Sequence, residues 1–209
     1  MGKGLFITFE GPEGAGKTTQ ITLLEEYLGQ KGVECIAVRE PGGTPIGDRV
    51  RQILLSPEFS EMRPRTEILL YAASRAQLVE QVIRPALDQG KVVLCDRYVD
   101  SSIAYQGYGA QWELQEVIQI NRWATGGLKP DRTYLLDLPV DISQSRMKNR
   151  GGKKDRMELK EKLFHERVRE GFLALLKSDP ERYRKLDARL SKEEIFTQLA
   201  DDVMKLMKG

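Results

Sequence analysis

A glycine-rich stretch that ends in lysine and threonine lies near the start of the sequence, directly behind the apolar run LFITF. Residues 11–18, GPEGAGKT, match the pattern G-x-x-x-x-G-K-[ST] in full. Glycines let backbone N–H groups turn inward around phosphate oxygens, and a following helix presents its positive end. We therefore predict a nucleotide-binding loop (P-loop), with Lys17 reaching the β- and γ-phosphates and the Thr18 hydroxyl binding Mg²⁺. The residues assigned to it are Gly11, Pro12, Glu13, Gly14, Ala15, Gly16, Lys17, Thr18 and Thr19.

Charged residues that follow other apolar runs indicate a metal site and a second phosphate site beside this loop. Asp96 ends the run VVLCD, where a carboxylate can bind Mg²⁺ directly or through water. Arg39 and Arg97 also follow apolar runs, and Arg51 lies on the next predicted helix. Because arginine forms bidentate contacts with phosphate, the three arginines together favour a second site for a phosphorylated acceptor. A GTPase would need an N-K-x-D motif after a later strand. The corresponding run here continues as LDLPVDIS and lacks that motif, which disfavours a GTPase.

The elements that must position these residues follow from the apolar pattern. Near-continuous apolar runs, typical of strands buried on both faces of a parallel sheet, occupy 5–10, 35–40, 92–96 and 133–138, with a weaker one at 182–188. Predicted helices occupy 18–31, 46–55, 66–89, 113–124, 141–149, 158–177 and 191–208. This alternation predicts an α/β fold with a doubly wound parallel sheet of about five strands, in which ligands collect at the carboxyl ends of the strands.

Length and composition narrow the class of protein. The 209 residues suit a single domain over the whole chain, and 40% hydrophobic with 31% charged residues is ordinary for a globular protein. A net charge of +2 does not favour nucleic-acid binding, because such domains carry a marked basic excess. No run reaches the length of a membrane span, so we expect a cytoplasmic protein without a membrane partner. Cys35 and Cys95 are expected as reduced thiols, with a disulfide as the less favoured alternative.

Three longer segments carry a resemblance to a known family. REPGGTPIGDRVR (39–51), YAASRAQ (71–77) and above all DRYVDSSIAYQGYG (96–109) resemble thymidylate kinases, and the likeness extends over essentially the whole chain. The string D-R-Y-x-x-S followed by A-Y-Q separates this family from adenylate, guanylate and uridylate kinases. The resemblance implies phosphorylation of dTMP to dTDP with ATP and Mg²⁺, in the formation of dTTP. It also implies a homodimer and a cis peptide bond between Glu40 and Pro41.

The same resemblance implies a pocket for the thymine base, and the residue chemistry agrees. Tyr71 supplies an aromatic ring on which a flat base can stack. Arg75, one helical turn further on, lies on the same face and offers a fixed donor to a carbonyl. The amide of Gln106, with Ser102 beside it, suits the ring N–H and the remaining carbonyl. Taken alone, Tyr71 could equally be a core aromatic; its combination with Arg75 and the later string favours the binding role.

Sugar and phosphate contacts are implied as well. Tyr105 lies where the family packs a ring against the deoxyribose, and Glu13 lies where the family accepts a hydrogen bond from the 3′-hydroxyl. The 5′-phosphate of the acceptor would contact Arg39, Arg51 and Arg97. Of these, Arg97 is also expected to act in catalysis, together with Lys17.

The segment 149–157 resembles the lid of the bacterial type of this family, because the variable P-loop positions carry no basic residue. Arg150 and Arg156 are therefore expected to supply positive charge in catalysis, and Arg146, one turn earlier, to stack on adenine. Lys153 and Lys154 leave this assignment open, and a solvated charge run is the preferred interpretation for them.

Two rival functions remain on sequence grounds. A non-catalytic nucleotide-binding regulator would be favoured by loss of Lys17, Asp96 or the lid arginines, and all are present. A related kinase for another small phosphate or sugar is disfavoured by Tyr71, Arg75 and Gln106. His165, the single histidine, lies on a charged predicted helix and is expected at the surface.

Overall fold

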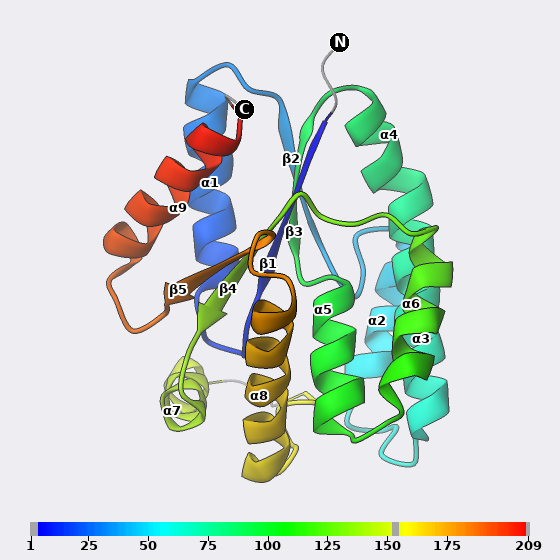
Figure 1. Ribbon diagram of the computed structural model, residues 1–209. Helices are drawn as coiled ribbons and strands as arrows, with labels where there is room; N and C mark the ends of the chain where they lie inside the picture. The colour runs from blue at the N-terminus through cyan, green and yellow to red at the C-terminus, as the bar shows by residue number, and fades with distance from the viewer. Residues whose placement is uncertain (1–3, 152–154, 208–209) are drawn as a thin grey trace.

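A single sheet of five parallel strands forms the centre of the molecule (Figure 1). The structure, a computed structural model, describes residues 4–151 and 155–207. The strands are β1 (Leu5–Glu10), β2 (Cys35–Arg39), β3 (Val92–Asp96), β4 (Arg132–Asp137) and β5 (Tyr183–Asp187). Each begins and ends within one residue of its predicted range, and the predicted fold class is confirmed. Their order is β2-β3-β1-β4-β5. The strand order reverses at β1, because β2 and β3 lie on one side of it and β4 and β5 on the other. Folds of this kind bind ligands at the carboxyl ends of the strands next to such a reversal.

Helices cover both faces of this sheet (Figure 1). They are α1 (Lys17–Gln30), α2 (Pro45–Leu55), α3 (Pro64–Leu78), α4 (Arg84–Asp88), α5 (Val99–Ser102), α6 (Leu114–Thr125), α7 (Val140–Arg150), α8 (Lys162–Ser178) and α9 (Lys192–Leu206). Two π-helical segments, η1 (Val79–Ile83) and η2 (Ile103–Gly109), join α3 to α4 and extend α5. No helix in the described ranges has both the length and the apolar character that crossing a membrane requires.

Alternate side chains of the central strands pack into two separate hydrophobic cores, one on each face of the sheet. Ile7 of β1 and Leu94 of β3 point to one face, where they pack with Leu24 of α1 and Leu199 of α9. Phe6, the neighbour of Ile7, points to the other face and packs against η1 and α4. The strands are buried on both faces for this reason, and α8 completes the second layer over β4.

One helical stretch, residues 99–109, was not predicted from the sequence. Its residues SSIAYQGYG combine serine and glycine, which favour turns over helix interiors. Tertiary packing stabilises this helix instead of local propensity. Its η2 part packs closely against α8: a Cβ at Gly109 would lie 2.7 Å from Cγ2 of Val168. The predicted helix 66–89, by contrast, is present as the continuous run of α3, η1 and α4.

Candidate active site

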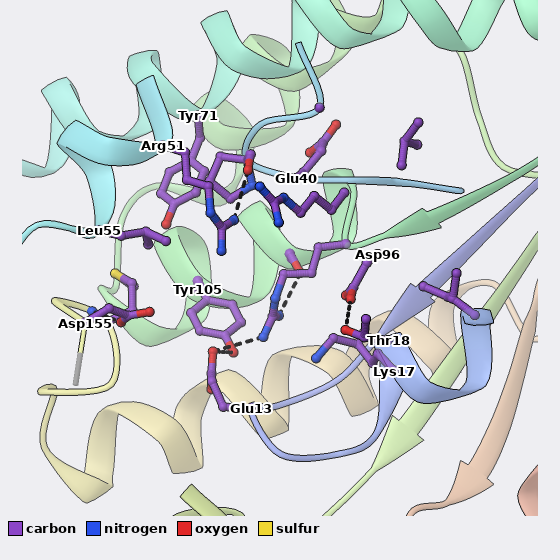
Figure 2. Close-up of a pocket in the computed structure, with 18 of the residues that line it drawn as sticks. Glu13, Lys17, Thr18, Glu40, Arg51, Leu55, Tyr71, Asp96, Tyr105 and Asp155 are labelled. Carbon is purple, nitrogen blue, oxygen red and sulfur yellow. Dashed lines mark hydrogen bonds and ion pairs between the residues drawn. The ribbon is translucent and has the colours of Figure 1, made fainter. Parts of the chain in front are cut away.

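A cavity of about 890 Å³ opens at the carboxyl edge of the sheet (Figure 2). The structure brings together in its walls Glu13, Gly14, Gly16, Lys17, Thr18, Thr19, Arg39, Arg51, Tyr71, Arg75, Asp96, Arg97, Ser102, Tyr105, Gln106 and Arg150. Lys17, Thr18 and Asp96 lie on one side of it, and Tyr71 and the α2 end lie on the opposite side. One cavity therefore connects the P-loop with the residues expected to bind a base.

The P-loop depends on glycine at its first position. Gly11 has a φ of 132°, and a Cβ there would lie 2.4 Å from the carbonyl oxygen of Leu136. Any side chain would therefore push the loop off β4. Two residues of α7 hold the loop from outside the cavity: Ser143 donates to the carbonyl oxygen of Glu13 (2.7 Å), and Arg146 donates to that of Gly14 (3.1 Å).

Lys17 is folded back on its own loop. Its Nζ donates to the carbonyl oxygens of Gly11 (3.1 Å) and Pro12 (3.0 Å). Burial, together with repulsion from Arg97, lowers the pKa of Lys17 to about 8. A bound anion would favour the charged form of Lys17 and so offset both effects, which suits this lysine to binding phosphate oxygens.

The predicted metal-binding pair is brought together. The Thr18 hydroxyl donates to Oδ2 of Asp96 at 2.6 Å, so a hydroxyl oxygen and a carboxylate meet at the start of α1. Oxygen donors of this kind suit Mg²⁺, which binds one or two carboxylates and completes its shell with water and phosphate. Among residues 4–151 and 155–207, no group of three or more His, Cys, Asp or Glu side chains forms a metal site, and Mg²⁺ held in this way needs none.

Glu13, Arg97 and Tyr105 form a polar cluster over the P-loop. Oε1 of Glu13 accepts from the Tyr105 hydroxyl (2.6 Å) and from Nη2 of Arg97 (2.9 Å). Burial raises the pKa of Glu13, but the charges of Arg97 and Lys17 and the bond from Tyr105 outweigh it and hold that pKa below its usual value. Arg97 has a positive φ of 70°, which is uncommon for a residue with a Cβ and occurs often at functional sites.

The other two arginines expected at the acceptor phosphate also lie at the cavity. Arg51 donates to the carbonyl oxygen of Pro41 (2.9 Å), whereas Arg39 is more exposed and lies 3.7 Å from Oδ1 of Asp48. The peptide bond between Glu40 and Pro41 is cis, as the family resemblance implies.

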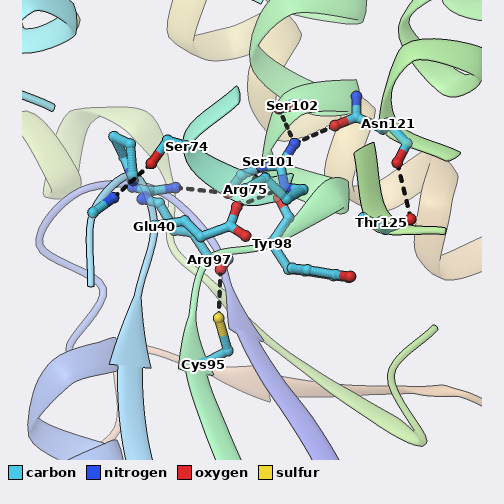
Figure 3. A network of polar contacts seen from close by, with 12 residues as sticks. Glu40, Ser74, Arg75, Cys95, Arg97, Tyr98, Ser101, Ser102, Asn121 and Thr125 are labelled. Carbon is cyan, nitrogen blue, oxygen red and sulfur yellow. Dashed lines mark hydrogen bonds and ion pairs between the residues drawn. The ribbon is translucent and has the colours of Figure 1, made fainter. Parts of the chain in front are cut away.

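Arg75 is the centre of a buried network (Figure 3). Its Nε donates to Glu40 (2.6 Å), and its Nη2 contacts Glu40 (2.5 Å) and the carbonyl oxygen of Tyr98 (3.0 Å). Its Nη1 donates to Ser102 (2.9 Å) and to Asn121. Arg75 therefore donates four hydrogen bonds to protein acceptors and also pairs with Glu40 through Nη2. A contact between Nη1 and a thymine carbonyl requires one of these bonds to be exchanged.

A residue that the sequence reasoning missed lies behind Gln106, next to the base end of the cavity but outside its lining. Glu67 of α3 is buried and accepts a 2.9 Å hydrogen bond from Nε2 of Gln106. Tyr71, half-buried, lies one helical turn further along α3. The spacing of Glu67, Tyr71 and Arg75 at i, i+4 and i+8 was a usable signal, because it places all three on one helix face.

The structure separates the two predicted lid arginines. Arg150 lines the cavity, with a largely exposed side chain that pairs with Glu158 (2.8 Å). Arg156 does not line it: it is buried, with Nη1 on Glu67 (2.6 Å) and Nε on the carbonyl oxygen of Leu54 (2.9 Å). In this structure the Arg156 side chain contacts α2 and α3 and not the cavity, and its expected role in catalysis stays a prediction.

Other expected residues lie at the edge of the site or beyond it. Arg146, expected at adenine, lies against the outside of the P-loop through its bond to Gly14. Gly11, Pro12 and Ala15 belong to the P-loop but are not among the residues that line the cavity. Lys153 and Lys154, within the expected lid, lie outside the described residues. Cys35 and Cys95 are free thiols, as expected.

Comparison with known proteins agrees with the geometry. The family model described as thymidylate kinase matches residues 9–199. A thymidylate kinase from a species of Exiguobacterium is 54% identical over 207 residues, covering 99% of this chain and 97% of the relative. Thymidylate kinases from Exiguobacterium sibiricum (53% identical, 98% of this chain and 96% of the relative) and Deinococcus radiodurans (51%, 95% and 96%) are similar to the same extent.

The residues matched by the family model include the P-loop and Arg39, Arg51, Tyr71, Arg97 and Gln106 of the cavity wall. A cavity that joins a nucleotide-phosphate loop to a second, arginine-lined pocket is the arrangement that a nucleoside monophosphate kinase needs. The chain belongs to the thymidylate kinase family.

Proposed function

We propose that this chain phosphorylates dTMP to dTDP, with ATP as phosphoryl donor and Mg²⁺ as cofactor, on the route to dTTP. The observation that carries the proposal is the continuous cavity in which Lys17 and Thr18 at one end and Tyr71 and Gln106 at the other share one space. Its volume of about 890 Å³ lies at the upper end of the range typical of small-molecule sites, as two nucleotides require.

The donor half follows from the P-loop. The loop N–H groups and the amino end of α1 bind the ATP phosphates, and Lys17 exchanges its loop carbonyls for phosphate oxygens. Thr18 and Asp96 hold Mg²⁺, which neutralises charge on the β- and γ-phosphates when bound. Arg146 is proposed to flank the adenine from α7.

The acceptor half places the 5′-phosphate between Arg39, Arg51 and Arg97, beside the P-loop. Three cations offset the repulsion between the acceptor phosphate and the ATP phosphates as they approach. Glu13, held as a carboxylate by Arg97, accepts from the 3′-hydroxyl, and the Tyr105 ring packs against the deoxyribose. Phosphoryl transfer then needs positioning and charge stabilisation, with no covalent intermediate on the protein.

The base stacks on Tyr71 in this proposal. Ser102 accepts from Arg75, so its hydroxyl proton is free to donate to a carbonyl of thymine. Arg75 contacts the second carbonyl by exchanging one of its Nη1 acceptors. Gln106 supplies the amide for the ring N–H.

An assay of ADP release across a panel of nucleoside monophosphates tests the proposal. We expect dTMP to give a kcat/KM at least about 100-fold above those of AMP, GMP and CMP, because these leave polar groups of the base pocket unpaired. Similar turnover of all four, or none with dTMP, would contradict it. Omission of Mg²⁺ should abolish turnover.

We further propose that the enzyme is a homodimer of the cytoplasm, where nucleotides are made and used. In support of the dimer, α3 and α6 carry exposed apolar side chains, among them Leu69 (52% exposed) and Trp123 (89% exposed). Light scattering coupled to size-exclusion chromatography checks it, and a mass of one chain, 23.8 kDa, would contradict it.

A further inference from the structure

Glu67 joins two regions that are far apart in the sequence. Its Oε1 accepts from Nε2 of Gln106 in η2, and its Oε2 pairs with Nη1 of Arg156 in the segment after α7. The carboxylate is buried, and the side chains of Glu67 and Arg156 are each only 9% exposed. Both oxygens are therefore held in one geometry with little access to water.

This contact decides which way the Gln106 amide faces. A carboxylate in an ion pair only accepts hydrogen bonds, so Gln106 must turn its NH₂ group toward Glu67. Turning the amide over would place two acceptor oxygens against each other in a buried position, at a cost comparable to that of an unpaired buried polar group. Among the residues that the structure describes, no donor reaches Oε1 of Gln106, although Gln106 lines the cavity. The amide therefore offers an acceptor as its free group.

Pyrimidines differ at the ring position that such an acceptor would meet. Thymine and uracil carry a proton on N3, which donates, whereas N3 of cytosine has a lone pair and accepts. We propose that Glu67 is a specificity-determining positioning residue: by fixing Gln106 with its Oε1 free, it selects bases with an N3–H and rejects cytosine. The inference rests on the proposed function, because it takes Gln106 as the residue that reads the base.

Arg156 supports this arrangement from the other side. Its backbone N–H donates to the carbonyl oxygen of Leu55 (3.1 Å) and its Nε to that of Leu54 (2.9 Å), so the guanidinium is fixed against the end of α2. The Gln106 backbone is fixed as well, because its carbonyl oxygen accepts from the N–H of Trp112 (3.1 Å). With both neighbours anchored, replacement of the carboxylate by an amide should free the orientation of Gln106.

The test measures dissociation constants of dTMP, dUMP and dCMP by calorimetry for wild type, Glu67→Gln, Gln106→Leu and the double variant. In Glu67→Gln the new amide can donate to Gln106, which can then turn its NH₂ toward N3 of cytosine. We expect the preference for dTMP over dCMP to fall at least about 10-fold, while the preference for dTMP over dUMP stays unchanged. If Glu67 had only a structural role, the variant would bind all three nucleotides more weakly by a similar factor.

Gln106→Leu should reduce the dTMP-to-dCMP preference by itself, and adding Glu67→Gln to it should change that preference no further. Glu80→Gln, an exposed glutamate on the same helical run, serves as the matched control and should bind as wild type does. An unchanged preference in folded Glu67→Gln would overturn the inference. If thermal unfolding shows that this variant does not fold, an unchanged preference in Gln106→Leu overturns it instead. Wild type that fails to phosphorylate dTMP would contradict the proposed function itself, which separates the two failures.

Discussion

The Thr18 hydroxyl and the Asp96 carboxylate, 78 residues apart in sequence, are joined by a hydrogen bond of 2.6 Å. The contact links the first turn of α1 to the end of β3, and it depends on β1 and β3 pairing in register, with Phe9 opposite Asp96. A nucleotide that brings Mg²⁺ would find both oxygen donors already in place.

Asp96→Asn should raise the Mg²⁺ concentration that half-saturates activity by about 10-fold or more, since the amide binds the cation far less well than the carboxylate does. Thr18→Val should have a similar effect, whereas Thr18→Ser keeps the hydroxyl and should not. Steady-state rates over a Mg²⁺ titration give the answer. Asp88→Asn, an exposed acid at the end of α4, is the matched control. Equal half-saturation in Asp96→Asn and wild type would remove Asp96 from the metal site.

The sequence predicted the P-loop and its neighbours because their signals are local. A glycine-lysine-threonine pattern between a strand and a helix determines its own geometry, and strand ends identify Asp96 and Arg97. The partners of Arg75 could not be read in this way. Glu40 follows β2, Tyr98 precedes α5 and Asn121 lies on α6, so only the tertiary packing of these segments against α3 brings them to one guanidinium.

The same limit explains the lid arginines. Arg150 and Arg156 look equivalent in sequence, each a cation beside a glycine-bearing stretch. The two arginines differ in their ion-pair partners. Arg156 pairs with Glu67, which lies about 90 residues earlier in the sequence, whereas Arg150 pairs with the nearby Glu158. A sequence pattern can supply candidate cations, whereas the choice between them depends on tertiary contacts.

Arg75→Ala should lower the free energy of unfolding by about 3–5 kcal/mol, because it leaves the buried Glu40 without its counterion. Burial already raises the pKa of Glu40 even with Arg75 beside it. Urea denaturation followed by circular dichroism measures the change. Arg189→Ala, which removes an exposed arginine paired with Asp187, should leave the midpoint nearly unchanged. If Arg75→Ala is as stable as wild type and only dTMP binding suffers, the arginine acts on the base and not on the fold.

Glu10 should make stability fall with rising pH. Burial, reinforced by the nearby Asp100, raises the pKa of Glu10 from 4.5 to about 8. Between these two values the folded state holds a proton at Glu10 that the unfolded state has lost, so the contribution of this group to stability declines as pH rises through the window. Each pKa unit of such a shift corresponds to about 1.4 kcal/mol.

Glu10→Gln isolates this effect, because glutamine keeps an acceptor for the Tyr98 N–H but does not titrate. The Ser101 hydroxyl, which donates to Oε2 of Glu10, would accept from the new amide instead. The stability of the variant relative to wild type should therefore grow from pH 5 to pH 8, as measured by urea denaturation at both values. A difference that stays constant over this range would mean that Glu10 is ionised throughout.

Arg150→Ala should lower kcat by at least about 100-fold, on the scale of other catalytic arginines. Arg150 is the described lid cation that lines the cavity, and its side chain, although paired with Glu158 at 2.8 Å, is itself 62% exposed and can turn to a phosphate oxygen. The KM for dTMP should change little, because the contact strengthens as charge develops on the transferred group.

Arg156→Ala should act differently, by lowering stability through the unpaired Glu67. Steady-state kinetics and thermal unfolding of both variants, with Lys148→Ala on the exposed side of α7 as control, separate the two roles. If Arg150→Ala keeps more than half of the wild-type kcat while a stable Arg156→Ala loses it, the segment after α7 must rearrange to bring Arg156 to the phosphates.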